Sequence, residues 1–241
     1  MKSLISALNL KTMPLSLAGV ILGALLAVAD YHVNWAVVPA VVLTAASLHV
    51  YQYSGNRLAL VPSVIFAVLS VYLSFGRIFM LESLLLLLFA YFIMRLAVGF
   101  LSTGRGRVAG AAVLTFLAGP VAVFGTFFLC SHSFGSWVLL FPALSVGVLA
   151  AATAGLGNGS GKTAVVIMTV VGLVLMSVYP FLRFYDPAHY RFVVVIPVYI
   201  MLLVWMSVDK TRIPDSFQSL FAFCLLILAV ITGLGYVTYL F

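Results

Sequence analysis

Long apolar runs separated by short breaks make up almost the whole chain. Each run holds about 20 mostly apolar residues, the length at which an α-helix spans the hydrocarbon core of a bilayer. The runs are continuously apolar rather than alternating, so they predict helices and not the strands of a membrane barrel. Breaks at glycine, proline and charged residues divide the chain into nine runs: 13–30, 35–53, 58–75, 78–100, 108–130, 135–156, 162–183, 190–208 and 216–241.

This pattern predicts an all-α fold, a polytopic membrane bundle of about nine transmembrane helices in one domain that covers residues 1–241. The composition points the same way, because 65% of the residues are hydrophobic and 7% are charged, and the mean hydropathy is +1.27. About a quarter of the residues are charged in a soluble domain. A chain this apolar cannot cover itself with polar surface, which excludes a soluble enzyme.

The distribution of Lys and Arg predicts the orientation of these helices. With the N-terminus in the cytoplasm, eight of the 12 basic residues lie on the inner side, three on the outer side, and Arg95 within a span. Basic residues gather on the cytoplasmic side of membrane proteins. We therefore expect a multi-pass protein of the cytoplasmic (inner) membrane, in which the net charge of +7 reflects membrane anchors and not a nucleic-acid partner.

Aromatic residues and histidines cluster in the predicted outer loops, as they do where a membrane meets water. They are Tyr31, His32, Trp35, His132, Trp137, Tyr179, Phe184, Tyr185, His189 and Tyr190. A ligand role for these histidines is the less favoured alternative. His49 lies well inside a span and is expected to face the bundle and form a buried hydrogen bond. Cys130 and Cys224 are expected to be unpaired core residues.

A glycine-rich segment precedes Lys162 and Thr163 and invites comparison with a phosphate-binding loop. The spacing does not fit, because Leu156 occupies the position that requires the first glycine. A P-loop nucleotidase is therefore excluded. Contact of Lys162 with an anion stays open, because this residue begins a predicted helix, where free N–H groups favour negative charge.

Four segments together resemble a known family. They are Leu10–Leu15, Gly119–Gly125, Pro142 through Asn158, and Gly161-Lys162-Thr163-Ala164-Val165-Val166. In order and in position relative to the spans, they are similar to segments of the UbiA superfamily of membrane prenyltransferases, closest to the 1,4-dihydroxy-2-naphthoate (menaquinone) branch. The resemblance is loose, covers most of the chain, and implies a UbiA-like bundle with a cytoplasmic N-terminus.

In that family two aspartate-rich motifs hold Mg²⁺, which binds the diphosphate of a polyprenyl donor, and this chain lacks both motifs. Where the family has Asn-Asp-x-x-Asp, this chain has Asn56 followed by Arg57 and, at the last position, Leu60. The second motif is missing, because Asn158 leads directly to Gly161-Lys162. The resemblance therefore implies no metal cofactor, since the Mg²⁺ ligands of the family are absent.

The resemblance also names candidate substrate-binding residues, in which cations replace the metal as partners of a diphosphate. They are Asn56, Arg57, Arg95, Asn158, Lys162 and Thr163. Arg95 stays open between this role and a side chain that extends to the nearer membrane surface.

Three functions follow as hypotheses. The first is a non-catalytic protein that binds a membrane lipid of the isoprenoid or quinone class, or that serves as a subunit of a membrane complex with a protein partner or with further copies of itself. The second is an active polyprenyltransferase of an unusual, metal-independent type. The third is a small transporter, for which Pro120, Pro142, Pro180 and Pro197 are candidate helix breaks. The sequence leaves open whether any enzymatic activity remains.

Overall fold

The computed structural model describes residues 13–30, 33–54, 58, 60–75, 113, 117–133, 135–157, 162–183, 196, 199–201 and 215–237. All regular structure within these ranges is helical. The elements are α2 (Met13–Asp30), α3 (Val37–Ser54), α4 (Leu60–Phe75), the π-helix η2 (Leu117–Val121), α7 (Ala122–Ser131), the 3-10 helix η3 (Trp137–Leu139), α8 (Leu140–Gly157), α9 (Lys162–Arg183) and α11 (Asp215–Val237).

The described helices confirm the predicted all-α class and follow the predicted runs closely. α2 and α9 have the predicted bounds, and the other runs that fall in described parts differ at their ends by a few residues. Residues 78–100 lie outside the described residues, as do 108–112 and 114–116 of the run 108–130. The run 190–208 is described only at 196 and 199–201, which are helical.

Two of the described helices, over Trp137–Ala154 and Thr163–Leu182, are long and apolar enough to cross a membrane, and the others are shorter apolar helices. The nine-span bundle itself therefore stays a prediction.

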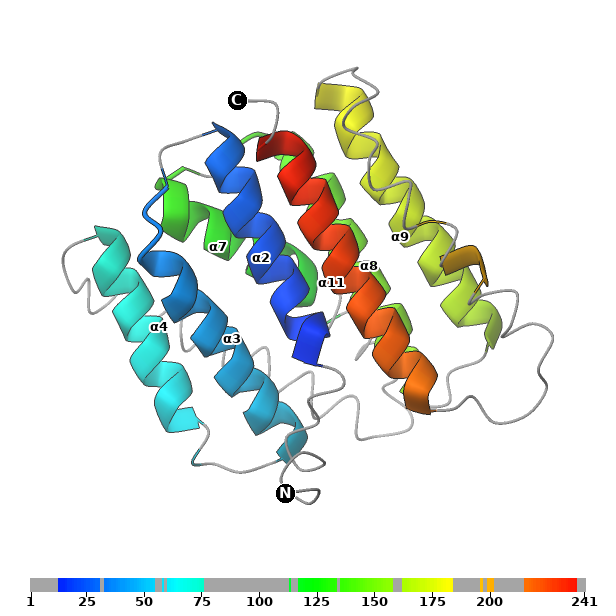
Figure 1. Cartoon of the computed structure of the whole chain (residues 1–241), viewed down its shortest axis with the longest axis horizontal. Helices are drawn as coiled ribbons and strands as arrows, with labels where there is room; N and C mark the ends of the chain where they lie inside the picture. Colours follow the sequence, from blue (N-terminus) through cyan, green and yellow to red (C-terminus); the bar gives the residue numbers. More distant parts are fainter. Residues whose placement is uncertain are drawn as a thin grey trace.

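The described helices form two layers, and α2 lies in the middle of one of them. In Figure 1, α4, α3, α2, α11 and α9 lie across the view, with α7 and α8 behind them. α2 contacts α3, α7, η2, α8 and α11, so it is the central element. The colours show that α2, α4, α9 and α11 run in one direction and α3 in the other. We call the end of the bundle at which α2 begins the Ser16 end, and the opposite end the Asn34 end.

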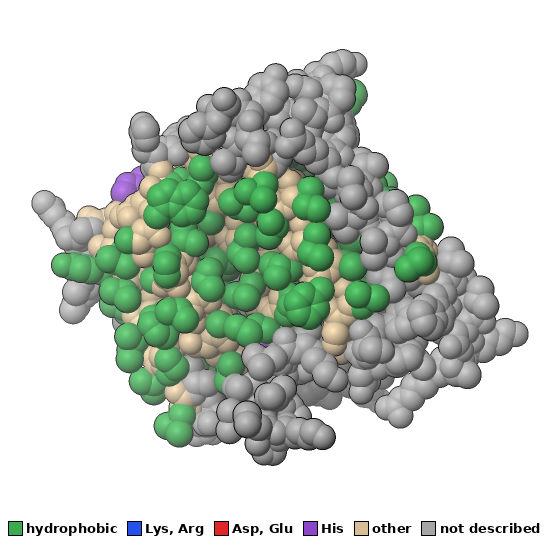
Figure 2. Space-filling model, viewed as in Figure 1, with side chains coloured by type: hydrophobic (Ala, Val, Ile, Leu, Met, Phe, Trp, Pro, Cys, Tyr) green, Lys and Arg blue, Asp and Glu red, His purple; other side chains and the backbone are tan. Residues whose placement is uncertain are grey.

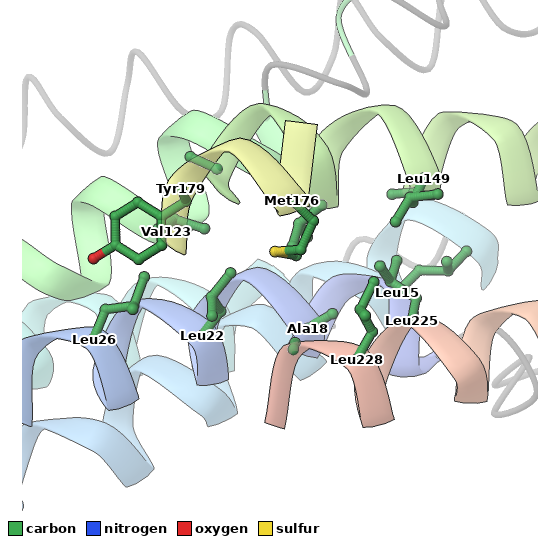
Figure 3. Packing of buried hydrophobic residues seen from close by; sticks show 14 of the residues in the cluster. Leu15, Ala18, Leu22, Leu26, Val123, Leu149, Met176, Tyr179, Leu225 and Leu228 are labelled. Carbon is green, nitrogen blue, oxygen red and sulfur yellow. The ribbon is translucent and has the colours of Figure 1, made fainter. Parts of the chain in front are cut away.

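The core is apolar and is organised along α2. Leu15, Ala18, Leu22 and Leu26 of this helix are buried, and belong to one cluster with residues of α7, α8, α9 and α11 (Figure 3). The partners labelled in that view are Val123, Leu149, Met176, Tyr179, Leu225 and Leu228. A helix that buries residues on nearly all sides is typical of the centre of a bundle.

Two glycines on α2 allow its backbone to touch that of η2 and α7. A Cβ atom on Gly19 would lie less than 3.0 Å from the carbonyl oxygen of Ala118 and from the Cβ of Ala122. One turn later, a Cβ on Gly23 would come equally close to the carbonyl oxygen of Val123. The spacing Gly-x-x-x-Gly places both residues on one face, as in closely packed membrane helices. Any side chain here would force the two helices apart.

The π-helix η2 is wedged between α2 and α8. A Cβ on Gly119 would lie 2.9 Å from the Cα of Gly147 and closer still to the carbonyl oxygen of Ala143. The next residue, Pro120, lies inside η2. A proline within an α-helix lacks an N–H and clashes with the carbonyl four residues earlier, and a wider π turn relieves that clash. Of the described candidate breaks, Pro120 alone lies at an irregularity, because α8 and α9 continue through Pro142 and Pro180.

We expect Gly19→Ala to destabilise the protein, because the methyl group must displace backbone atoms of η2. Overpacking of this kind costs about 1 to 3 kcal/mol, and it should appear as a lower melting temperature of the full chain in detergent. Gly125→Ala on α7 is the matched control, because its new methyl group would meet nothing within 4 Å. Equal melting temperatures for the two variants would contradict the close contact.

Candidate functional site

The structure places few of the predicted substrate-binding side chains. Asn56, Arg57, Arg95 and Asn158 lie outside the described residues. Lys162 begins α9, and Thr163 is exposed in the first turn of that helix. The described helix ends that flank the candidates in sequence, at α3, α4 and α9, all lie at the Ser16 end, with α4 at one edge of the view and α9 at the other (Figure 1).

A partly buried hydrogen bond joins α2 to α3 near this same end. The Ser16 hydroxyl oxygen lies 2.8 Å from Nδ1 of His49, and His49 is 1% exposed. This confirms the prediction that His49 faces the bundle and is hydrogen-bonded. The pair satisfies two polar groups that would otherwise be costly among apolar side chains. Its partner Ser16 was not predicted, because nothing in the sequence links two residues on different helices.

The opposite end carries a second polar cluster, which joins three elements. Asn34, just before α3, donates from Nδ2 to the carbonyl oxygen of Leu73 on α4 at 2.8 Å. Ser74 donates to the carbonyl oxygen of Leu129 on α7 at 2.6 Å and lies 3.0 Å from Nε2 of His132. Because the single Ser74 proton points to Leu129, Nε2 of His132 is the donor to Ser74.

The backbone and ring of His132 complete this cluster. His132 caps the end of α7 in the left-handed conformation, with φ of 57°, and its N–H donates to the carbonyl oxygen of Phe128. Its ring stacks on Phe75 of α4, with 4.8 Å between centroids and 12° between planes. These contacts explain His132 as a helix cap that ties α7 to α4.

Two buried hydroxyls in the described structure have no hydrogen-bond partner, those of Tyr199 and Thr232. Tyr199 is fully buried, and its ring meets that of Phe221 edge to face at 5.5 Å. Cys130 and Cys224 are free and buried, which confirms their prediction as unpaired core residues. Within the described part of the chain, no group of three or more His, Cys, Asp or Glu residues is placed to hold a metal ion.

We expect Ser16→Ala to lower stability by about 1 to 3 kcal/mol, because it removes a hydrogen-bond partner of the buried His49. Ser47→Ala is the control on α3, since that hydroxyl bonds only back to the carbonyl oxygen of Leu43 on its own helix. Both variants would be followed by thermal unfolding in detergent. A loss no larger for Ser16→Ala than for Ser47→Ala would show that the link between the helices contributes nothing.

Comparison with known proteins found no match to this chain among family models, curated proteins or solved structures. The UbiA resemblance therefore rests on the quoted segments alone, and what it implies enters below as a proposal.

Proposed function

We propose that this chain is a multi-pass integral membrane protein, a UbiA-like bundle that binds a membrane lipid or serves as a complex subunit without catalysing prenyl transfer. The observation that carries membrane embedding is the inverted polarity of α4. Its buried residues are small and mostly polar: Ser63, Ala67, Ser70 and Ser74. Its exposed residues are large and apolar: Val61, Val64, Ile65, Leu69 and Tyr72.

In water, this helix would expose its large apolar side chains at a cost in free energy. In hydrocarbon, the same side chains would be well solvated. A surface helix of a soluble protein turns its apolar stripe to the core and its polar face outward. In lipid, small and hydroxyl-bearing residues gather between helices, where they permit close packing and hydrogen bonds. Ser74, which bonds α4 to the Leu129 carbonyl of α7, is an example.

The outer faces of α9 and α11 support the same proposal. Ile167, Val170, Val171 and Val174 form an exposed stripe at helical spacing on α9, and Phe223 and Ile227 are exposed on α11. Figure 2 shows hydrophobic side chains over the described part of the face that α4, α3, α2 and α11 present. Exposed apolar patches of this extent mark contact with a membrane or a partner protein.

The directions of the helices also suit repeated crossing. α3 runs opposite to α2 and to α4 (Figure 1), as it must if each of these helices spans the membrane. α8 and α9 likewise run antiparallel. The Ser145 hydroxyl donates to the Gly172 carbonyl at 2.6 Å, and these two residues are about equally far in sequence from the short segment that joins the helices.

The non-catalytic part of the proposal rests on the sequence. Both aspartate-rich motifs of the UbiA superfamily are missing, so the chain lacks the ligands that would hold Mg²⁺ against a departing diphosphate. A metal-independent prenyltransferase is the second candidate. One observation favours it: Lys162 and Thr163 begin α9, where unpaired N–H groups attract anions.

Membrane embedding predicts that a charge on the outward face of α9 impairs insertion. Val170→Arg should lower the fraction of protein found in the membrane, because an arginine at the centre of a spanning helix costs about 2.5 to 3.5 kcal/mol. Thr163→Arg, at the exposed start of the same helix, is the control and should insert normally. A water-soluble protein would give the opposite result, since Val170→Arg would be tolerated at an exposed site.

The lipid-binding proposal predicts a bound molecule of isoprenoid or quinone mass. Native mass spectrometry of the full chain, extracted gently from its own membrane, should detect it. For a phosphate-bearing lipid, Lys162→Ala should release it through loss of a charged partner, and Arg183→Ala, at the other end of α9, should not.

Two results would redirect the proposal. An unliganded chain that copurifies with a second polypeptide would favour the complex subunit. Conversion of an allylic diphosphate in the presence of a chelator would instead support the metal-independent enzyme.

A further inference from the structure

Exposed aromatic side chains gather at the Asn34 end of the bundle. Trp35 is 58% exposed in the turn before α3, and Trp137 is 69% exposed at the first residue of η3. Tyr72 and Phe181 are exposed near the last residues of α4 and α9. We call these four residues the aromatic end group.

Hydrogen bonds and contacts between helices place their elements at the same end. Asn34, next to Trp35, donates through its side chain to Leu73, next to Tyr72, and through its backbone to the carbonyl oxygen of Cys130. Cys130 lies near the end of α7, a few residues before Trp137. The antiparallel pairing of α8 and α9, together with the contact of α9 with η3, brings Phe181 to this end.

Along α4, the exposed surface changes from aliphatic to aromatic toward this end. On α4, Val61, Val64, Ile65 and Leu69 precede Tyr72. On α9, an aliphatic stripe begins at Ile167 and is followed near the end by Phe181, with Leu182 exposed beside it. A surface in one uniform solvent gives no reason for this change. A bilayer does, because its hydrocarbon core favours aliphatic groups and its interface favours Trp and Tyr.

The lengths of these bands fit a bilayer. From Val61 to Tyr72 the rise is about 16 Å, and from Ile167 to Phe181 about 21 Å, at the α-helical rise. Half of a typical hydrocarbon core is about 15 Å. An aliphatic band that starts at or beyond the midplane therefore reaches the interface near the aromatic end group.

We propose that the Asn34 end lies in the headgroup layer of one membrane leaflet, and that Trp35 and Trp137 anchor it there. Their indole rings lie among the glycerol groups, where the ring contacts hydrocarbon and the N–H reaches a polar acceptor. The partner of this surface is the interfacial layer of a lipid bilayer, not a protein or a soluble ligand. The inference rests on the membrane embedding proposed above and adds the depth of the chain in the bilayer.

Tryptophan fluorescence tests this depth directly, since the chain has three tryptophans, Trp35, Trp137 and Trp205. The full chain carrying Trp205→Phe would be reconstituted in phosphatidylcholine vesicles with bromine near the glycerol or near the acyl-chain ends. We expect at least about twofold stronger quenching by the shallow bromines, because interfacial indoles lie close to the headgroups. Trp35→Phe and Trp137→Phe, each added singly, separate the two residues.

A deep probe serves as the matched control. Val64→Trp in a chain with all three native tryptophans changed to Phe places an indole on the aliphatic band of α4, about 12 Å along the helix from Tyr72, and should be quenched more by the deep bromines. If this probe behaves so but Trp35 and Trp137 are also quenched from the deep position, the interfacial anchor is wrong and embedding stands. If neither lipid quenches the probe, both the anchor and the membrane embedding are wrong.

Discussion

The close approach of α2 to η2 and α7 is the constraint on which the rest of the bundle depends. At Gly19 and Gly23 the backbones themselves are in contact, and Gly119 continues that contact to α8. α2 also touches α3 and α11, so a change in its position would move every neighbouring helix. Helices surrounded by lipid gain no hydrophobic free energy by associating, and close packing and hydrogen bonds take its place. In this chain the glycines permit close packing, and the hydroxyls of Ser16, Ser74 and Ser145 form hydrogen bonds between helices.

The helices were predictable from sequence and their packing was not. Apolar runs of spanning length are a local property, so the positions of α2 and α9 could be predicted to the residue. A lone histidine among apolar residues can also be predicted to need a hydrogen-bond partner, and His49 has one in Ser16. Its partner depends on how two helices are placed in space, which no local pattern encodes. The spacing of Gly19 and Gly23 was a visible signal of close packing, but it does not say which helix comes close. The candidate site was predicted by resemblance, and most of its side chains lie outside the described residues.

Polarity in this protein is sorted in two directions at once. Across the bundle, small and hydroxyl-bearing residues face inward on α4 and large aliphatic residues face outward. Along the bundle, the described polar side chains that join different elements lie mostly toward the ends, with Ser16 and His49 at one and Asn34, Ser74 and His132 at the other. Both gradients have the same physical origin, because a hydrogen-bonding group is most costly where water is scarcest. Together they are the distribution expected of a chain embedded in a bilayer, as proposed above.

The contact between Gly19 and Ala118 also has a consequence for the order of assembly. The two residues lie far apart in sequence, so α2 is complete long before the ribosome has made the segment that it packs against. During that interval the glycine face of the newly made helix has no native partner, and such a face can also pair with the same face of another nascent chain. Correct folding therefore depends on α2 being held apart from other chains until η2 and α7 arrive. Slow translation through the intervening residues lengthens that interval, and crowded polysomes bring more nascent chains within reach of the exposed face.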